Sequence, residues 1–337
     1  MINFKNLETP YTIAEIGGNH EGNFQYAKKL CQLAINTNVD CIKFQLYKAN
    51  DLVNPKISPE RNNHFKKFEL TKKEYIYLAD MCSEANKDFN ASIWSKNMTY
   101  YINKYMSFYK IGSGDMNCYP LIKSFLKYNK PIVISTGLAT MDEIVNTVNF
   151  IRNENSLYTK NSMINLLQCT TMYPIKNNEA NISVMNEYKK INNVGVGYSD
   201  HTIGSDALLL AAIYGANILE FHFTDNREDK VFRDHQVSLM PNEVNKLIQD
   251  IKKFKLLSGS PNKFPLETEI KNGHIISFRR AVYLNKNLKK GHKVKEDDLI
   301  ALRPMEGISS VHFEKLIGKT LKIDIEKYEK LDFNFFE

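Results

Sequence analysis

The stretch KPIVISTGLATMDEIVNTVNFIRNE, residues 130–154, places a short apolar strand directly before an amphipathic helix. The run at 130–137 has an apolar, β-branched centre, IVI at 132–134, which is typical of a strand. Thr140 and Glu143 stand at capping-box spacing, in which each side chain binds the other residue's backbone N–H at the first turn of a helix. A buried strand followed by a helix is the repeating unit of a parallel α/β fold.

The same unit recurs along the first part of the chain. Helical periodicity separates the strand-like runs, and Thr71 predicts the N-cap of a helix at 71–85. A polar stretch at 48–70 is predicted to be a long loop. Eight units favour a closed (β/α)₈ barrel over an open doubly wound sheet, because GSGD at 112–115 is not a GxGxxG fingerprint at the first turn. The strand-like runs lie at 11–17, 40–47, 88–94, 106–115, 130–137, 162–170, 193–200 and 217–223.

Composition describes an ordinary globular protein. The chain has 337 residues, is 43% hydrophobic and 25% charged, and carries a formal net charge of +7, which suits anionic substrates. The lysines are scattered rather than clustered with aromatics, so we expect no nucleic-acid partner. No apolar run approaches the roughly 18 residues of a membrane helix. Five cysteines without a CxxC spacing, and no signal pattern at the N-terminus, predict free thiols in a reducing cytoplasm.

The alternation of strand-like and helical patterns ends near residue 275. The stretch that follows has short strand-like pieces and a Lys-rich turn, which indicate a small β-rich domain. We therefore expect a (β/α)₈ catalytic barrel at 1–260, a linker at 261–276 and a small β-rich domain at 277–337.

Polar residues gather at the carboxyl ends of the predicted strands, where (β/α)₈ barrels place their active sites. Four ionisable residues stand inside apolar runs, where an unpaired charge is costly, and convergence on one cavity would explain them together. They are Lys43, Lys110, Glu220 and His222. Two buried lysines predict a bound anion, and short serine hydroxyls suit its oxygens. The strand-end residues are Glu15, Lys43, Gln45, Ser92, Lys110, Ser113, Asp115, Ser135, Gln168, Thr170, Ser199, Asp200, His201, Glu220 and His222.

The run ILEFHF, residues 218–223, directs Glu220 and His222 to one face of a strand, because side chains at i and i+2 share a face. His201 ends the neighbouring strand, so the two imidazoles could share a divalent cation such as Mn²⁺, Fe²⁺, Co²⁺ or Zn²⁺. Glu220 could then exchange a proton beside it. A buried His–carboxylate hydrogen bond without a metal explains the same spacing equally well.

Eight motifs resemble the sialic acid (N-acetylneuraminate) synthase family in order and spacing, over nearly the whole chain. The family implies a (β/α)₈ barrel followed by a small antifreeze-like (SAF, β-clip) domain. It also implies a domain-swapped homodimer in which that domain caps the partner's barrel. The motifs are AEIGGNHEG (14–22), IKFQ (42–45), YKIGSGD (109–115), ISTG (134–137), QCTTMYP (168–174), GYSDHTIG (197–204), LEFHFT (219–224) and LRPMEG (302–307).

The resemblance implies a metal-dependent condensation of phosphoenolpyruvate with an open-chain N-acetylhexosamine. The sugar would be N-acetylmannosamine or a 2,4-diacetamido-trideoxyhexose, and the products a nine-carbon 2-keto acid and phosphate. The expected metal is Mn²⁺, with Mg²⁺ or Co²⁺ as alternatives. By similarity, Arg303 would reach the sugar in the partner's site. The roles implied are catalysis by Glu15, Asp115 and Glu220; phosphoenolpyruvate binding by Lys43, Ser92, Lys110, Ser113, Ser135 and Ser199; sugar binding by Gln45, Tyr173, Asp234 and Arg303; and metal binding by His201 and His222.

Several positions depart from the family pattern. Asp115 stands where Glu is usual, Gln168 where His is frequent, Thr171 where Asn or Ser is frequent, and Phe232–Arg233 where Gly-Pro commonly precedes Asp234. The departures concern the expected sugar side, so a sialic, legionaminic, pseudaminic or other nonulosonic acid remains open as the product. Two alternatives are a phosphorylated-aldose condensing enzyme of the octulosonate-phosphate type and a non-catalytic ligand-binding descendant.

Overall fold

The computed structural model describes residues 2–160 and 162–337. By its internal contacts, the chain divides into two compact units, the first extending to Gly259 and the second running from Ser260 to Glu337. Each unit has its own hydrophobic core.

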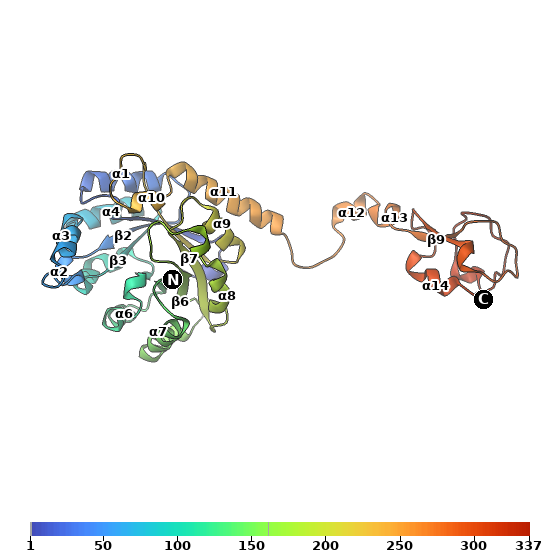
Figure 1. Cartoon of the computed structure of the whole chain (residues 1–337), viewed down its shortest axis with the longest axis horizontal. Coiled ribbons are helices and arrows are strands. Elements are labelled where there is room, and N and C mark those ends of the chain that lie inside the picture. Colours follow the sequence, from blue (N-terminus) through green and yellow to red (C-terminus); the bar gives the residue numbers. More distant parts are fainter. Residues whose placement is uncertain (1, 161) are drawn as a thin grey trace. The chain divides into compact units, whose positions relative to one another are not determined.

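The first unit is a closed barrel of parallel strands, which confirms the predicted (β/α)₈ fold (Figure 1). Each strand pairs with the next one along the chain, and β8 closes the circle by pairing with β1. The register sets Glu15 beside Lys43 on one side and His222 on the other. The strands are β1 (Tyr11–Gly17), β2 (Cys41–Leu46), β3 (Asp88–Ile93), β4 (Tyr109–Ile111), β5 (Ile132–Ser135), β6 (Ile164–Gln168), β7 (Val194–Asp200) and β8 (Ile218–His222).

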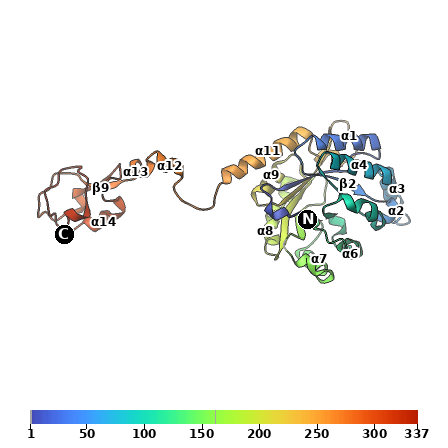
Figure 2. The ribbon, with the colours of Figure 1, turned by 180° about the vertical axis from the view of Figure 1, so that it is seen from behind.

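Helices surround the strands on the outside of the barrel, as both views show (Figures 1 and 2). The predicted capping boxes of Thr71 with Glu74 and of Thr140 with Glu143 are both formed at helix N-termini. Within the described residues, no helix is long and apolar enough to cross a membrane. The barrel helices that follow the predicted strands are α1 (Phe24–Ile35), α4 (Lys72–Glu84), α5 (Thr99–Ile102), α6 (Tyr119–Leu126), α7 (Met141–Glu154), α8 (Met185–Tyr188), α9 (Asp206–Ile213), α10 (Asp234–Val237) and α11 (Pro241–Ser258).

The prediction of a long loop at 48–70 is wrong. Two further helices, α2 (Ala49–Leu52) and α3 (Pro59–Lys67), occupy this stretch. The segment has little apolar periodicity, so its helical character cannot be recognised from the pattern of burial. Buried Asn62 holds it in place instead, because its side-chain amide donates to the backbone oxygen of Val53 at 2.8 Å.

The amino-terminal end of the barrel interior is filled by apolar side chains. Phe4 packs at this end and contacts Tyr11 and Phe108 edge to face; its ring centroid lies 5.2 Å from that of Tyr11 and 5.4 Å from that of Phe108. This geometry is favourable for aromatic pairs and excludes water. The cluster, called the floor below, consists of Phe4, Tyr11, Ile13, Cys41, Phe108, Val133, Leu167 and Ile218.

The second unit is small and contains a two-stranded antiparallel sheet of β9 (Ala281–Leu284) and β10 (Leu299–Leu302). Its helices are α12 (Glu267–Lys271), α13 (His274–Ser277) and α14 (Phe313–Leu316), so part of the predicted linker is helical. Asp298 is buried and accepts from Lys286 at 2.6 Å and from His292 at 2.7 Å. This ion cluster joins the turn after β9 to the start of β10.

Candidate active site

A cavity of about 1120 Å³ opens at the carboxyl ends of the strands. It brings together every predicted site residue of the first unit. Arg303 belongs to the second unit. The predicted residues that line the cavity are Glu15, Lys43, Gln45, Ser92, Lys110, Ser113, Asp115, Ser135, Tyr173, Ser199, His201, Glu220, His222 and Asp234.

Lys43 and Lys110 converge on one carboxylate at the base of the cavity. The ammonium nitrogen of Lys43 lies 3.2 Å from Glu220 Oε1 and also contacts the carboxylate of Glu15. Lys110 Nζ lies 3.2 Å from Glu220 Oε2 and donates to Ser135 Oγ at 2.7 Å. All four charged side chains are at least nine-tenths buried, so each depends on the others for its neutralisation.

The two carboxylates of this cluster have opposite pKa shifts. Burial raises the pKa of Glu15 to about 7, since the attraction of Lys43 offsets desolvation only in part. Burial also disfavours the charge of Glu220, but Lys110 and Lys43 outweigh it and lower the pKa of Glu220 to about 2. Near neutral pH, Glu220 is therefore ionised while Glu15 exchanges a proton. Two nearby carboxyl groups with separated pKa values are a common basis of acid–base catalysis.

Short hydroxyls surround the two ammonium groups. Ser92 Oγ accepts from Lys43 at 3.2 Å, and Ser199 Oγ donates to Glu220 at 2.9 Å. Ser113 Oγ accepts from the backbone N–H of Gly137 at 3.0 Å. A Cβ at Gly137 would lie 2.2 Å from Thr171 Oγ1, so glycine is needed there for the loops after β4, β5 and β6 to approach each other.

His201 and His222 face each other beside this cluster, with ring centroids 5.4 Å apart. His201 Nδ1 lies 2.7 Å from the backbone oxygen of Thr170 and must donate to it, which leaves its Nε2 lone pair free. His222 Nδ1 is buried without a hydrogen-bond partner and lies 3.8 Å from Asp234 Oδ2. Burial lowers the pKa of both imidazoles, so both are neutral near pH 7.

These imidazoles are suited to a divalent cation. Nε2 of His201 has a free lone pair, neutral His222 has one lone-pair nitrogen and an unpartnered Nδ1, and neutral imidazole is a good ligand for Mn²⁺, Co²⁺ or Zn²⁺. In the part of the chain that the structure describes, no three His, Cys, Asp or Glu side chains are grouped to hold a metal. Water or substrate would have to supply the remaining ligands.

Sequence reasoning named Phe232 only as a departure and missed Phe68 and Trp94, which form an aromatic wall with it on one side of the cavity. The ring of Phe232 lies against Gly18, where a Cβ would come within 2.7 Å of it, and 4.9 Å from the ring of Phe68. Trp94, which directly follows β3, packs 5.1 Å from Tyr47. Trp94 could have been found from its strand-end position, whereas Phe68 follows the unpredicted helix α3.

Two of the departures noted in the sequence have different surroundings. Arg233 lines the cavity, with its guanidinium carbon 4.6 Å from the centroid of the Tyr173 ring and its Nε 3.3 Å from Asp234 Oδ1. Gln168 does not line it: its amide donates to Ala180 O at 3.1 Å and accepts from Tyr188 at 3.1 Å. Gln168 therefore joins β6 to the following helical segment.

The fold and the cavity define the class of protein. A (β/α)₈ barrel with buried lysines, paired carboxylates and two imidazoles at its strand ends has the construction of an enzyme active site for an anionic substrate. Comparison with known proteins then identifies the family. The chain belongs to the NeuB family, whose model matches residues 30–263, and the SAF domain model matches residues 279–330.

Individual relatives agree with this assignment. The N,N'-diacetyllegionaminic acid synthase of Campylobacter jejuni is 32% identical over 320 residues, covering 91% of this chain and 94% of that protein. The N-acetylneuraminate-9-phosphate synthase of Drosophila melanogaster is 29% identical, covering 98% of this chain and 97% of that protein. A crystal structure of the N-acetylneuraminic acid (sialic acid) synthetase of Leptospira borgpetersenii, in complex with citrate, has a TM-score of 0.72 at 26% identity and covers 81% of this chain and 95% of that one. The protein is thus an enzyme of the acid-synthase type.

Proposed function

We propose that this enzyme condenses phosphoenolpyruvate with an open-chain N-acetylhexosamine to give a nine-carbon 2-keto acid and inorganic phosphate. The observation that carries the proposal is the buried cluster in which Lys43 and Lys110 share the ionised Glu220. Two buried ammonium groups with one carboxylate that remains ionised between them suit a multiply charged anion. The names of the relatives, synthases of N,N'-diacetyllegionaminic acid and of N-acetylneuraminate 9-phosphate, support a reaction of the same type.

In the proposed complex, the phosphate and carboxylate of phosphoenolpyruvate bind Lys43 and Lys110. Hydroxyls from five strand ends or adjoining loops surround the same space and can donate to the anionic oxygens. Glu220 keeps the two ammonium groups in place before the substrate arrives. The hydroxyl residues are Ser92, Ser113, Ser135, Thr171 and Ser199.

The reaction needs a proton donor and a proton acceptor. C3 of phosphoenolpyruvate bonds to the sugar aldehyde carbon, and the aldehyde oxygen takes up a proton to become a hydroxyl. Water then adds to C2 and loses a proton, and the C–O bond to phosphate breaks. Glu15 is the proposed donor, because its pKa near 7 lets it carry a proton at neutral pH. Asp115, whose pKa burial raises, is the proposed acceptor.

The sugar would lie on the side of the cavity that carries the imidazoles. His201 and His222 would hold a divalent cation, for which Mn²⁺ is our first choice, and such a cation would polarise the sugar aldehyde. Tyr173, whose ring is tilted by 40° against that of His201 with centroids 3.9 Å apart, forms a wall beside them. Asp234, Gln45 and, from the SAF domain of a partner chain, Arg303 are proposed to hold the sugar hydroxyl and acetamido groups.

Phosphate release from phosphoenolpyruvate tests the proposal. We would measure it with Mn²⁺ and with a chelator against N-acetylmannosamine, its 6-phosphate and 2,4-diacetamido-trideoxyhexoses. Release that requires one of these sugars and disappears with the chelator would support the reaction and the metal together. Sugar-dependent release that persists in the chelator would contradict the metal alone. No release with any of the sugars would count against the reaction.

A further inference from the structure

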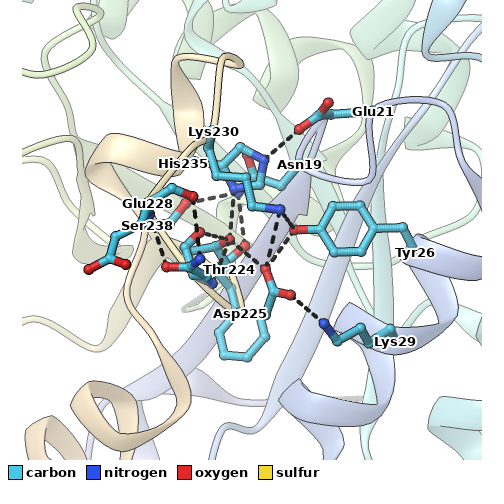
Figure 3. Close-up of polar contacts among 12 residues, drawn as sticks. Asn19, Glu21, Tyr26, Lys29, Thr224, Asp225, Glu228, Lys230, His235 and Ser238 are labelled. Carbon is cyan, nitrogen blue, oxygen red and sulfur yellow. Dashed lines mark hydrogen bonds and ion pairs between the residues drawn. The ribbon is translucent and has the colours of Figure 1, made fainter.

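The end of the loop between β8 and α10 and the first residue of α10 bring Phe232, Arg233 and Asp234 to the cavity. A polar network ties this part of the chain to the segment that precedes and begins α1 (Figure 3). The partners on the α1 side include Asn19 and Glu21, from the motif AEIGGNHEG. Neither residue has a role in the proposed chemistry. Two segments about 200 residues apart in the sequence are thus joined by several hydrogen bonds that the proposed chemistry does not explain.

His235 is the centre of the network. Its ring is fully buried, with Nδ1 2.7 Å from Thr224 Oγ1 and Nε2 3.1 Å from Glu21 Oε1. Burial lowers the pKa of His235 and favours the neutral ring. An ionised carboxylate only accepts, so Nε2 carries the hydrogen and Nδ1 accepts from the Thr224 hydroxyl. Both ring nitrogens are then satisfied by residues outside α10.

A second chain of hydrogen bonds holds the backbone of the neighbouring residue. The amide of Asn19 donates to Phe223 O at 2.9 Å and to Ser238 Oγ at 2.8 Å. Ser238 Oγ in turn donates to the backbone oxygen of Asp234 at 2.7 Å. Because α10 is a single short turn, these bonds and the ring of His235 are its main polar anchors to the segment before α1.

The backbone at Glu21 shows that its position is imposed by its surroundings. Glu21 has φ of +51°, in the left-handed region that a non-glycine residue rarely adopts. Such conformations persist only where the surrounding structure holds them, and they are frequent at functional sites. The next residue, Gly22, has φ of +75°, and a Cβ there would lie 1.8 Å from Lys67 O. The loop thus has a strained backbone at Glu21, in the conformation that places the Glu21 carboxylate against His235.

An outer part of the same network ends in a solvent-exposed lysine, Lys29, which serves as an internal contrast. Asp225 accepts from Tyr26 at 2.6 Å and from Lys29 at 2.7 Å, and Lys230 donates to the Tyr26 hydroxyl at 2.5 Å. The side chain of Lys29 is 62% exposed. Ion pairs of this kind contribute little, because water competes for both charges. Lys29 is therefore expected to matter least, whereas His235 and Thr224 are fully buried and their hydrogen bond is shielded from water.

We propose that His235 is a positioning residue: held between Thr224 and Glu21, it fixes the first turn of α10 so that the Asp234 carboxylate faces His222 on the sugar side of the cavity. Asp234 Oδ2 lies 3.8 Å from His222 Nδ1 in this arrangement. The inference rests on the proposed function, since it assigns Asp234 to the sugar. It assigns a role in positioning Asp234 to the Asn19–Glu21 segment and to two residues that do not line the cavity, Thr224 and His235.

Thr224→Val and Thr224→Ser form a matched pair for the test in the full-length enzyme. Valine keeps the shape but leaves His235 Nδ1 buried without a donor, whereas serine keeps the hydroxyl. We expect Thr224→Val to lower kcat/KM for the sugar by about 10- to 100-fold, as for a misplaced catalytic group, with KM for phosphoenolpyruvate within about twofold. Thr224→Ser and Lys29→Met should behave as wild type.

Backbone hydrogen exchange separates failure of this inference from failure of the proposed function, because it needs no substrate. Exchange at residues 232–238 should accelerate in Thr224→Val and not in Thr224→Ser. Unchanged exchange, or equal loss of sugar and phosphoenolpyruvate affinity in a folded Thr224→Val protein, would overturn the positioning role. If Thr224→Val unfolds, hydrogen exchange in Glu21→Met against Glu21→Gln gives the same comparison; exchange is the readout to use there, because Glu21 itself lines the cavity. A wild-type enzyme without turnover but with the expected exchange pattern would overturn only the proposed reaction.

Discussion

The two ends of the barrel interior are built from the same eight strands but differ in chemistry. At the amino-terminal end, Phe4, Tyr11 and Phe108 pack edge to face and close the barrel. At the carboxyl end, Lys43 and Lys110 are buried around shared carboxylates in an open cavity. Burial stabilises the first set and is costly for the second. We infer that the floor stabilises the fold, whereas the cavity at the carboxyl end, called the mouth below, lowers the stability of the protein in exchange for function.

The largest effect is expected at the mouth, for Lys110→Met. Methionine fills a similar volume but removes one of the two charges that would bind the anion, so phosphate release should fall by about 10³-fold or more through loss of electrostatic stabilisation. Glu220 keeps Lys43 as a partner, so the protein should stay folded. Steady-state phosphate release and thermal unfolding of each protein would be measured together.

Lys123→Met is the matched control, because Lys123 is 61% exposed and pairs with Glu154 on the surface. It should change neither quantity. A Lys110→Met enzyme that keeps most of its activity would remove the buried lysine from the substrate site.

At the floor, Phe108→Ala should produce the opposite result. Removing a fully buried ring that contacts Phe4 and Tyr11 should lower the free energy of unfolding by about 3–5 kcal/mol through lost contacts and a cavity. KM values of the protein that remains folded should not change. Urea unfolding measures the first effect, and kinetics at low temperature the second. Altered substrate affinity would show that the two ends are not independent.

The pH dependence of Glu15 sharpens the comparison. Its pKa is raised from the ordinary value of 4.5 to about 7 in the folded protein, which therefore binds an extra proton between these values. Stability from this group is full below pH 4.5 and is lost as pH rises through 7. Glu15→Gln should therefore gain stability relative to wild type as pH increases from about 5 to 8. Unfolding curves across that range check the sign.

Activity should follow the same ionisation. If Glu15 donates a proton, wild-type kcat should fall above about pH 7, and Glu15→Gln should lose about 10²–10⁴-fold without that pH limb. Activity that instead falls below pH 7 would make Glu15 a base.

The smallest effects are expected from loss of a single tyrosine hydroxyl, made once at the floor and once at the mouth. Tyr11→Phe removes the hydroxyl that donates to Asp88 and should cost about 1 kcal/mol of stability without a kinetic effect. Tyr173→Phe removes a hydroxyl at the mouth and should weaken sugar use by about tenfold, the typical scale of one lost hydrogen bond, while leaving stability nearly unchanged. Reversal of this pattern would contradict the division of labour between floor and mouth.

Much of the site could be predicted from the sequence, because a strand end is a local feature. Lys43, Glu220 and His222 stand in apolar runs at the carboxyl ends of strands, and the barrel brings all such ends to one cavity. The aromatic wall escaped prediction because Phe68 follows α3, a helix with no apolar stripe. The pairing of His235 with Glu21 also escaped, because 214 positions separate them in the chain and no local pattern connects them.

The sequence by itself determined the barrel and the composition of its mouth, since hydrophobic periodicity and strand direction depend on neighbouring residues. Tertiary structure alone decided how those groups behave. Glu15 holds a proton near neutral pH and Glu220 does not, although both are buried carboxylates in contact with Lys43. The difference arises because Lys110 and Ser199 also contact Glu220, and electrostatic energy in a dry cavity depends on distances that only the closed barrel sets.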